Sequence, residues 1–527
     1  MAKYEIKDGV GIIPEGTTSI EADAFKDCKD LKSIVIPKSV TSIGWYAFKG
    51  CTGLTEIVIP DNVTEISRGC FNGCNGLISI KLPNDVKLGR GVFKDCSSLV
   101  NITLPNGMED LNSDLEIFNH KWLFHYGFFA GCSSLTSIVI PDSVTFIDDQ
   151  TFQGCSSLTS ITIPKKVKYI GRLAFDGTPW YNSLPNGIVY INDILYRYKG
   201  KMPKGTSLVI REGTEKLGPD SFAGCVNLIS VVIPNSVTSI GRSAFANCTD
   251  LKSIEIPNSV TSIASTAFKN CTSLTSANIP SSVKCIGTRE FEGYSDELNK
   301  DSGGAFRGCS NLVRISIGNG VQYIGLRAFK ECTGLTEIEL PNSIKSIDAE
   351  VFDGCTGLKN IVIPEGVEEI SFSAFAKCTA LEKVVLPCSL KNLKKSAFKG
   401  CTAIKEIIVP AENEKYIMKQ LPKELHPFVK VTNKTLVDTT PGPITDSVSV
   451  PTKEVVEKPT PVAEAVATEK NSSTPVKKEK AASTPVKEEP AKATTKPTEE
   501  STVKSTTKPS KEEPKSLFGR ILGLFKK

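Results

Sequence analysis

The feature that most constrains this chain is a cysteine that returns every 22 or 23 residues, apart from three interruptions. Each of these cysteines stands three residues after a phenylalanine, and all but one stand nine residues before a proline, as at Pro37 and Pro60. The series consists of Cys28, Cys51, Cys74, Cys96, Cys132, Cys155, Cys225, Cys248, Cys271, Cys309, Cys332, Cys355, Cys378 and Cys401. A constant period of about 20 to 30 residues is typical of a solenoid, in which each coil buries its apolar positions against its neighbours.

The repeating unit reads L-x-x-I-x-I-P-x-x-V-x-x-I-x-x-x-A-F-x-x-C-x-x and is almost intact in residues 135–157, LTSIVIPDSVTFIDDQTFQGCSS. Its first part alternates like a short β-strand, and proline closes the strand where no further ladder hydrogen bond is needed. The V-x-x-I part can form a second extended segment, and the phenylalanine of A-F-x-x-C fills the interior. We therefore predict a β-rich solenoid with a period of about 23 residues and a parallel sheet on one face.

These residues resemble the BspA-like leucine-rich repeats, most clearly in SVTSIGRSAFANCTDLKSIEIPNSVTSI, residues 236–263. The similarity extends over residues 12–411. Members of that family are mostly known as surface-associated binding and adhesion proteins of anaerobic bacteria and of some protozoan parasites. The resemblance therefore implies a leucine-rich repeat fold and a role in binding at the cell surface.

The repeat also indicates how the chain is divided. We expect an N-terminal half-coil or cap in residues 1–30, the solenoid in residues 12–411 and a C-terminal cap in residues 412–430. Terminal coils need such covers because their apolar positions would otherwise be exposed.

Three insertions interrupt the period, at residues 106–127, 178–200 and 288–304. The second alternates apolar and polar residues around Asn192-Asp193 and is expected to form a hairpin. Insertions in a solenoid project from one face, so they are either partner contacts or tolerated surface loops. The candidate contacts are Trp122, Tyr126, Trp180 and Tyr181.

The C-terminal part has a different composition. Residues 431–515 are rich in Thr, Pro, Lys, Glu, Ser, Val and Ala, which predicts a disordered tether. Residues 516–527, SLFGRILGLFKK, predict a short amphipathic basic helix that cannot cross a bilayer. This segment either docks on lipid, docks in a groove of a partner, or is an inert end. The residues proposed for docking are Leu517, Phe518, Arg520, Ile521, Leu522, Leu524, Phe525, Lys526 and Lys527.

Charge and hydropathy restrict the partners and the location. The formal net charge is +5, and residues 431–527 contribute most of it with 17 basic and 13 acidic residues. The repeat region is therefore almost neutral, which argues against nucleic-acid binding. The sequence shows no secretory leader and no apolar stretch long enough to span a bilayer, which indicates a cytoplasmic protein. The family resemblance implies the cell surface instead.

Catalytic chemistry has little support in the sequence. Fourteen of the 17 cysteines share one repeat position, which predicts a column of small buried thiols, and so many unpaired thiols suit a reducing or anaerobic environment. The other three, Cys70, Cys285 and Cys388, replace residues within the repeat and show no metal-site spacing. Histidine occurs only at positions 120, 125 and 426. We therefore assign no catalytic, metal-binding or cofactor-binding residues and expect no enzyme activity, no cofactor and no small-molecule substrate.

What remains is the exposed face of the L-x-x-I-x-I strands, where the residues flanking the central isoleucine point outward. This face lacks aromatic platforms, which argues against sugars and single-stranded nucleic acids. Its residues either contact a protein partner or are simply good strand formers. The charged candidates are Glu56, Lys81, Glu255, Arg314, Glu337, Glu339, Lys383 and Glu406.

We predict a non-enzymatic protein-binding module with an unidentified protein ligand. It is either a surface adhesion or interaction protein, as the resemblance implies, or an intracellular scaffold that its C-terminal segment localises.

Overall fold

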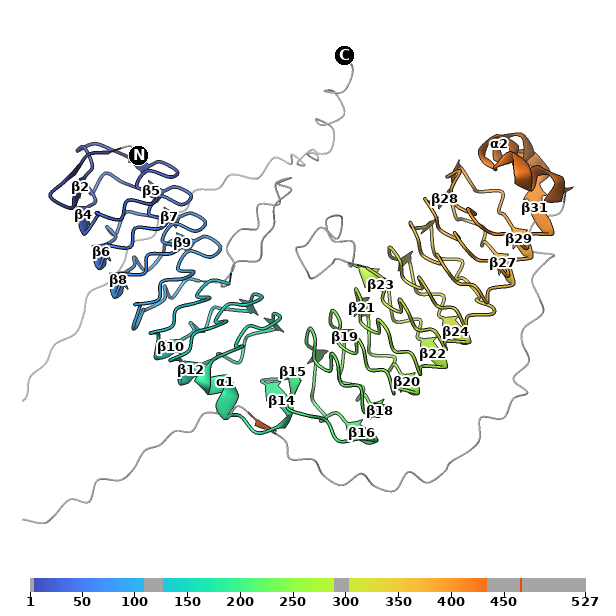
Figure 1. Ribbon diagram of the computed structural model, residues 1–527, viewed down its shortest axis with the longest axis horizontal. Helices are drawn as coiled ribbons and strands as arrows, with labels where there is room; N and C mark the ends of the chain where they lie inside the picture. The colour runs from blue at the N-terminus through green and yellow to red at the C-terminus, as the bar shows by residue number, and fades with distance from the viewer. Residues whose placement is uncertain (1–3, 109–126, 289–302, 434–464, 467–527) are drawn as a thin grey trace, which may run out of the picture. The chain divides into compact units, whose positions relative to one another are not determined.

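A computed structural model describes residues 4–108, 127–288, 303–433 and 465–466 (Figure 1). The chain divides into two compact units, residues 1–469 and 470–527, and the described residues all belong to the first. Trp122, Tyr126, His120, His125 and all nine docking residues proposed near the C-terminus lie outside the described residues.

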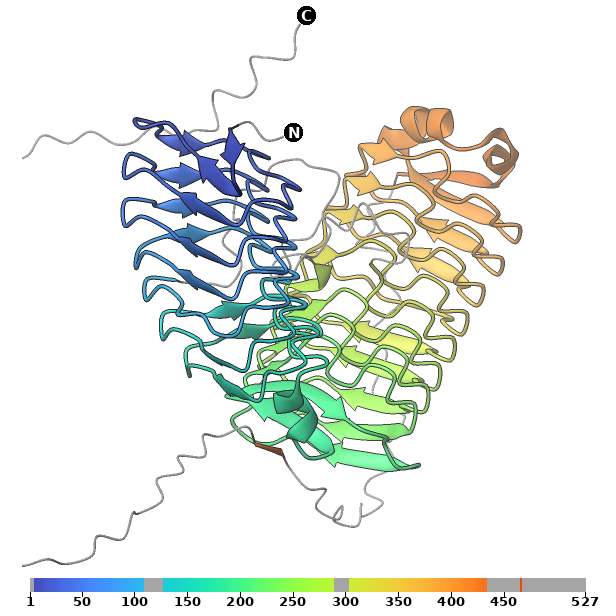
Figure 2. The ribbon, with the colours of Figure 1, turned by 60° about the vertical axis from the view of Figure 1, so that its left-hand side comes forward.

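The described residues form a parallel β-solenoid of about 17 turns with a period of about 23 residues, as the sequence predicts. Most regular coils contribute one strand from their L-x-x-I-x-I part, and Figure 2 shows these strands stacked coil upon coil. These first-row strands are β4 (Ser33–Val35), β6 (Glu56–Val58), β8 (Ser79–Lys81), β10 (Ser137–Val139), β12 (Ser160–Thr162), β16 (Thr206–Val209), β18 (Leu228–Val232), β20 (Ser253–Glu255), β22 (Ser276–Ile279), β24 (Arg314–Ile317), β27 (Asn360–Val362), β29 (Lys383–Val385) and β31 (Glu406–Pro410).

The V-x-x-I part of most coils forms a second, shorter strand. Pairing along each row is parallel and in register, so Ser239 of one coil pairs with Ser262 of the next. These second-row strands are β3 (Ser19–Ile20), β5 (Ser42–Ile43), β7 (Glu65–Ile66), β9 (Lys87–Leu88), β11 (Phe146–Ile147), β13 (Tyr169–Ile170), β17 (Lys216–Leu217), β19 (Ser239–Ile240), β21 (Ser262–Ala264), β23 (Cys285–Thr288), β25 (Tyr323–Ile324), β26 (Ser346–Ile347), β28 (Glu369–Ile370) and β30 (Asn392–Leu393).

The phenylalanines of successive coils form a ladder along the interior. Ring centroids of consecutive rungs in the regular coils are 4.9–5.8 Å apart, and the ring planes are within 15° of parallel. Almost all of these rings are fully buried. Each ring thus covers the apolar face of the ring before it, and the rings together fill the interior from coil to coil.

The cysteine column has a hydrogen-bonding role as well as filling space. Twelve thiols of the column, from Cys51 to Cys155 and from Cys248 to Cys401, donate to the main-chain carbonyl of the phenylalanine one coil earlier, with Sγ···O distances of 3.0–3.2 Å. Cys28, in the first coil, donates instead to the Lys26 carbonyl of its own coil. The repeat position therefore suits a small apolar side chain that also carries a weak donor.

The sequence predicts that the insertion at residues 178–200 projects from the solenoid, but the structure places it inside the stack of coils. It forms α1 (Pro179–Ser183) and an antiparallel hairpin of β14 (Gly187–Ile191) and β15 (Ile194–Lys199), and every residue of β14 is buried. Alternate hairpin side chains pack into two different hydrophobic cores, with Val189 in the first and Tyr190 in the second. The hairpin is therefore a partition within the stack. We call the coils before it the first stack and the coils after it the second stack.

The residue that begins this partition is Thr178, which stands where a regular coil has cysteine. Its hydroxyl donates to the Phe175 carbonyl of its own coil at 2.8 Å and accepts from the Tyr181 main-chain N–H at 3.1 Å. It is thereby the N-cap of α1. A threonine at this position interrupts the cysteine column and caps a helix.

Both ends of the described solenoid are covered. At the N-terminal end, β1 (Ile6–Lys7) pairs antiparallel with β2 (Val10–Ile12), and the Tyr4 ring stacks on Phe25 at 5.5 Å. At the C-terminal end, η2 (Ala411–Asn413), α2 (Glu414–Gln420) and η3 (Lys423–Phe428) precede β32 (Val429–Thr432), which pairs with β31. A further short strand, β33 (Ala465–Val466), pairs with β14.

If the phenylalanine ladder holds the coils together, Phe268→Ala lowers the free energy of unfolding by about 3–5 kcal/mol. The Phe268 ring is fully buried between rings 5.2 and 4.9 Å away, so its removal leaves a cavity. Phe268→Leu costs less, because it retains most of the volume. Denaturant unfolding followed by circular dichroism measures both changes.

The matched control is Phe372→Ala, because the Phe372 side chain is exposed. We expect the control to change stability by no more than about 0.5 kcal/mol. Equal effects of the two alanine substitutions would show that the ladder is not a major source of stability.

Candidate binding surfaces

The exposed face of the first-row strands carries a column of valines. In β4 and β6 the central isoleucine is buried, whereas the residues on either side of it are exposed. Val35 is 74% exposed and Val58 is 65% exposed, and further exposed valines occur at the same repeat position at Val139, Val209 and Val232. Side chains of this kind normally lie inside a protein, so their exposure in one column identifies a candidate contact surface.

Register joins several of these valines into continuous apolar stripes. Ile12 of β2 pairs with Val35 of β4, and the next first-row strand contributes Val58. In the second stack, Val209 of β16 pairs with Val232 of β18. We call these two groups the N-terminal valine stripe (Ile12, Val35, Val58) and the central valine stripe (Val209, Val232).

The charged residues predicted on this face lie in three kinds of surroundings. The side chains of Glu56, Lys81, Glu255 and Arg314 are exposed on first-row strands. Glu337 and Glu339 are exposed too, but their coil has no assigned first-row strand. Lys383 and Glu406 are half-buried on β29 and β31.

Glu406 is engaged by two lysines. Its carboxylate lies 2.8 Å from Lys430 Nζ on β32 and 3.2 Å from Lys383 Nζ on β29. The hydrogen bonds from Lys430 and Lys383 lower the pKa of Glu406. These pairs join the last coil to the cap, so Glu406 and Lys383 have a local structural role that the sequence period does not reveal.

Trp180 and Tyr181 of the second insertion lie against the core. Tyr181 is buried and packs edge-on against Tyr196, with ring centroids 5.8 Å apart. Trp180 is half-buried and packs edge-on against Phe175 at 4.9 Å. The partition uses both side chains to cover the end of the first stack; Tyr181 is buried there, whereas the half-buried Trp180 remains a candidate contact.

The thiols are sequestered inside the coils. Fifteen of the 17 cysteines are buried, and only Cys28 and Cys388 are partly accessible. Burial raises the pKa of Cys51 and of Cys155 to about 12, and burial likewise raises the pKa of Cys70 and Cys74. Thiolates of these buried groups are therefore scarce at neutral pH.

The described part of the chain offers few side chains for metal binding or acid–base catalysis. No group of three or more His, Cys, Asp or Glu side chains within it could hold a metal ion. The ring of His426 lies in the C-terminal cap, where Nε2 donates to the Leu421 carbonyl at 3.1 Å. This interaction holds the turn that follows α2.

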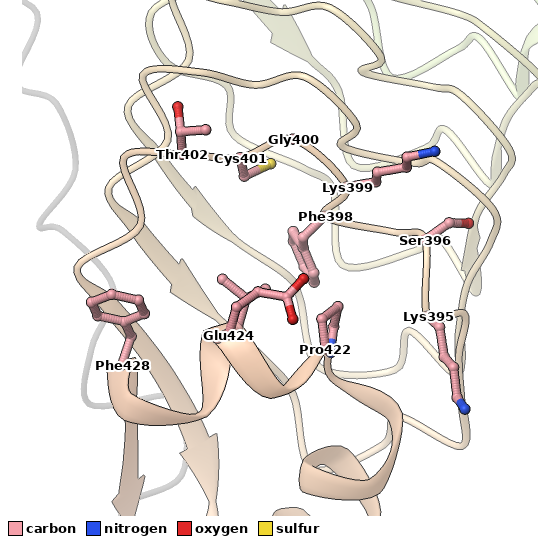
Figure 3. A pocket seen from close by; sticks show the side chains of 11 residues that line it. Lys395, Ser396, Phe398, Lys399, Gly400, Cys401, Thr402, Pro422, Glu424 and Phe428 are labelled. Atoms are coloured by element: carbon pink, nitrogen blue, oxygen red, sulfur yellow. The ribbon is translucent and has the colours of Figure 1, made fainter.

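A cleft of about 560 Å³ lies between the last coil and the C-terminal cap (Figure 3). Phe398 and Cys401 belong to the coil side, and Pro422, Glu424 and Phe428 belong to the cap side. Phe398 is the last rung of the ladder, where the cap replaces the next ring as a cover. The cleft is a consequence of an imperfect fit between a flat coil and a helical cap.

Charged side chains connect the two stacks across the partition. Arg172 Nε lies 2.6 Å from Asp220 Oδ2, and Lys168 Nζ lies 3.1 Å from Glu215 Oε2. The buried Asp149 carboxylate accepts a 2.6 Å hydrogen bond from the Arg172 main-chain N–H. Burial, and then the charge of Asp148, raise the pKa of Asp149 to about 7, although Arg172 and Arg242 act in the opposite direction.

Modification of the native protein by a thiol reagent should therefore be limited to Cys28 and Cys388, the two partly accessible thiols. The other thiols should react only after denaturation, because burial shields them and in most of them also disfavours the thiolate. Mass spectrometry after brief alkylation, without and with denaturant, measures this difference. Rapid native labelling throughout the column would contradict the buried arrangement.

The raised pKa of Asp149 predicts a pH-dependent effect of Asp149→Asn. The folded state favours the neutral acid, so the stability linked to this group is full below about pH 4 and is lost as the pH rises to about 7. The asparagine retains the acceptor for Arg172 and carries no charge. We expect Asp149→Asn to raise the thermal midpoint relative to the wild type at pH 8 and to leave it nearly unchanged at pH 4.

Exposed Asp142 provides the control, since Asp142→Asn should not alter the pH dependence. A midpoint for Asp149→Asn that is below the wild type at pH 8 would show that the ionised form is the favoured one.

None of the helices in the described part of the chain combines the length and the apolar composition that crossing a bilayer requires.

Several solved structures are similar to this chain. A leucine-rich repeat protein from Bacteroides ovatus is 26% identical, with 79% of this chain and 87% of that chain covered and a TM-score of 0.29. A leucine-rich repeat protein from Eubacterium ventriosum is 25% identical, with 70% and 91% covered and a TM-score of 0.37. The T. pallidum leucine rich repeat protein is 28% identical, with 46% and 95% covered and a TM-score of 0.31.

No curated protein matches the chain. The family described as BspA type leucine rich repeat region matches residues 12–120, 124–202, 190–300 and 302–420. Since this match extends over well more than half of the sequence, and the described coils have the period and the strands of such repeats, the protein belongs to the BspA-type leucine-rich repeat family.

Proposed function

We propose that the protein is a non-enzymatic protein-binding module whose partner lies across the exposed face of the first-row strands. The observation that carries this proposal is the exposure of the two valine stripes. Single exposed valines are common on protein surfaces, but register places these side chains next to one another along the solenoid. A partner that covers a stripe removes a continuous apolar area from water.

The polar residues around the stripes complete a surface of the kind that proteins bind. The exposed serine Ser33 precedes Val35 on β4, and Glu56 precedes Val58 on β6. Apolar centres with polar rims are typical of protein interfaces, and the charged residues of the face would set the orientation of a partner. A long row of similar coils also allows a partner to make many weak contacts at once.

Within this function, the family points to adhesion or interaction at a cell surface. The alternative is an intracellular scaffold, and it is carried by the apolar and basic pattern of residues 516–527. In that case Leu517, Phe518 and the other proposed docking residues would hold the protein at a lipid surface or on a second partner.

The test is the double variant Val35→Glu and Val58→Glu. Glutamate occurs naturally at this repeat position at Glu255 and Glu339, so the coils accommodate it. Because a partner would have to bury two new charges, we expect binding to weaken at least tenfold while the thermal midpoint stays unchanged. Affinity capture from extracts of the native cell identifies the partner, and titration with the purified partner then measures the dissociation constant.

The matched control is Val226→Glu together with Val313→Glu, since these exposed valines lie outside the valine column. The control should bind like the wild type. If both double variants bind equally well, the valine stripes are not the binding surface.

A further inference from the structure

A groove of about 360 Å³ lies on the second row of strands, over the partition between the two stacks. Residues of β11 and β13 from the first stack line it, together with Ile194 of the hairpin and residues of β17, β19 and β21 from the second stack. This surface is distinct from the valine stripes, which belong to the first row. Both stacks therefore contribute to a single depression that a regular solenoid would not contain.

The groove results from a change of side-chain size along one repeat position. In the first stack this position holds Phe146 and Tyr169, whose rings stack with centroids 4.3 Å apart. After the partition the paired residues are Lys216, Ser239 and Ser262. The small serines leave space, and the aromatic pair closes one end because β11 and β13 are the first strands of the lining.

Charge on the lining has one sign. Lys168, Lys216 and Arg242 line the groove, and no carboxylate is among its lining residues. Glu215 pairs with Lys168 from outside the lining. Lys216 is half-buried, and burial lowers its pKa, although the charge of Glu215 acts in the opposite direction. The groove therefore places Lys216 in surroundings that solvate its charge poorly, and an anionic ligand would stabilise that charge.

Apolar side chains also line the groove. The rings of Phe146 and Tyr169 are half-buried, and the buried side chains at the bottom are Ile170, Ile194, Leu217 and Ile240. A ligand must then be both apolar and negatively charged. Six neighbouring strands at about 4.8 Å spacing extend over about 24 Å, which is the length of about seven extended residues. An extended peptide can place aliphatic side chains on the floor and carboxylates at the rim.

We propose that this groove binds an extended acidic peptide segment with aliphatic side chains, and that its carboxylates pair with Lys216 and Arg242. A basic peptide would be repelled by these cations, and a neutral sugar chain would bring them no opposite charge. The chain itself contains a segment of the required chemistry at residues 454–469, EVVEKPTPVAEAVATE. Because the groove and the valine stripes are separate surfaces, a peptide can fail to bind the groove while a partner still binds the valine stripes. A peptide can equally bind the groove when no partner binds the valine stripes.

The experiment measures the fluorescence anisotropy of a labelled peptide, EVEVEVE, titrated with the full-length protein. Ser239→Tyr fills the groove, and tyrosine occurs naturally at the same repeat position at Tyr169 and Tyr323. Lys216→Met removes a charge and retains the stem of the side chain. We expect each substitution to weaken peptide binding at least tenfold, and added salt to weaken binding to the wild type.

Matched controls come from coils beyond the groove. Ser346→Tyr repeats the steric change at the same repeat position as Ser239, and Lys345→Met removes an exposed lysine directly before β26. Both should bind EVEVEVE like the wild type. Equal binding by Ser239→Tyr and Ser346→Tyr overturns the proposal, and so does binding of KVKVKVK as tight as that of EVEVEVE.

Two further binding measurements distinguish other occupants of the groove. An oligogalacturonate that binds where EVEVEVE does not would assign the groove to acidic sugars and overturn the peptide. The second arm is a full-length variant in which Glu454, Glu457, Glu464 and Glu469 are changed to Gln. Tighter EVEVEVE binding by this variant than by the wild type would support the peptide and show that the chain's own acidic segment competes for the groove. If neither chain binds the probe, the proposal is wrong.

Discussion

The interaction on which the rest of the structure depends is the stacking of one buried phenylalanine on the next, at 4.9–5.8 Å along each stack. Each ring covers its neighbour, and a thiol one coil later hydrogen-bonds the main-chain carbonyl of the same phenylalanine. The interior is therefore filled by repetition, with sulfur and aromatic carbon at the same place in every regular coil. Such an interior leaves binding to the outer surfaces of the two strand rows.

The partition is the one place within the described coils where this repetition changes. The Phe175 ring meets Tyr196 edge-on, and on the other side Tyr198 faces Phe222 at a tilt, so parallel stacking is interrupted. Ion pairs between coils that are not sequence neighbours then connect the stacks. The groove lies over the same place because two different side-chain columns meet there. The ion pairs and the groove thus occur where the period is broken, whereas the periodic strand rows provide long, uniform surfaces.

Much of the fold follows from sequence alone, because a solenoid coil repeats both its packing and its register. The period predicts the buried Phe268 and Cys271, and alternation predicts that Val35 points outward. The expectation that the insertion at residues 178–200 projects from the solenoid is wrong. The hairpin around Tyr190 is apolar on both faces because it lies between two hydrophobic cores. Non-periodic contacts could not be predicted: Lys430 reaches Glu406 from a strand outside the repeat, and the groove requires Tyr169 and Lys216 to become neighbours across an insertion.

Coil-upon-coil stacking is tested most directly by removing one whole period. Deleting residues 237–259 joins Ser236 to Val260 and leaves every remaining coil in phase, whereas deleting residues 237–248 joins two segments out of phase. Thermal unfolding of the two chains, followed by circular dichroism, is the measurement. The account predicts cooperative unfolding with a midpoint close to that of the parent for the 237–259 deletion, and loss of the folded second stack for the shorter deletion. A whole-period deletion that unfolds the protein as fully as the half-period deletion would contradict it.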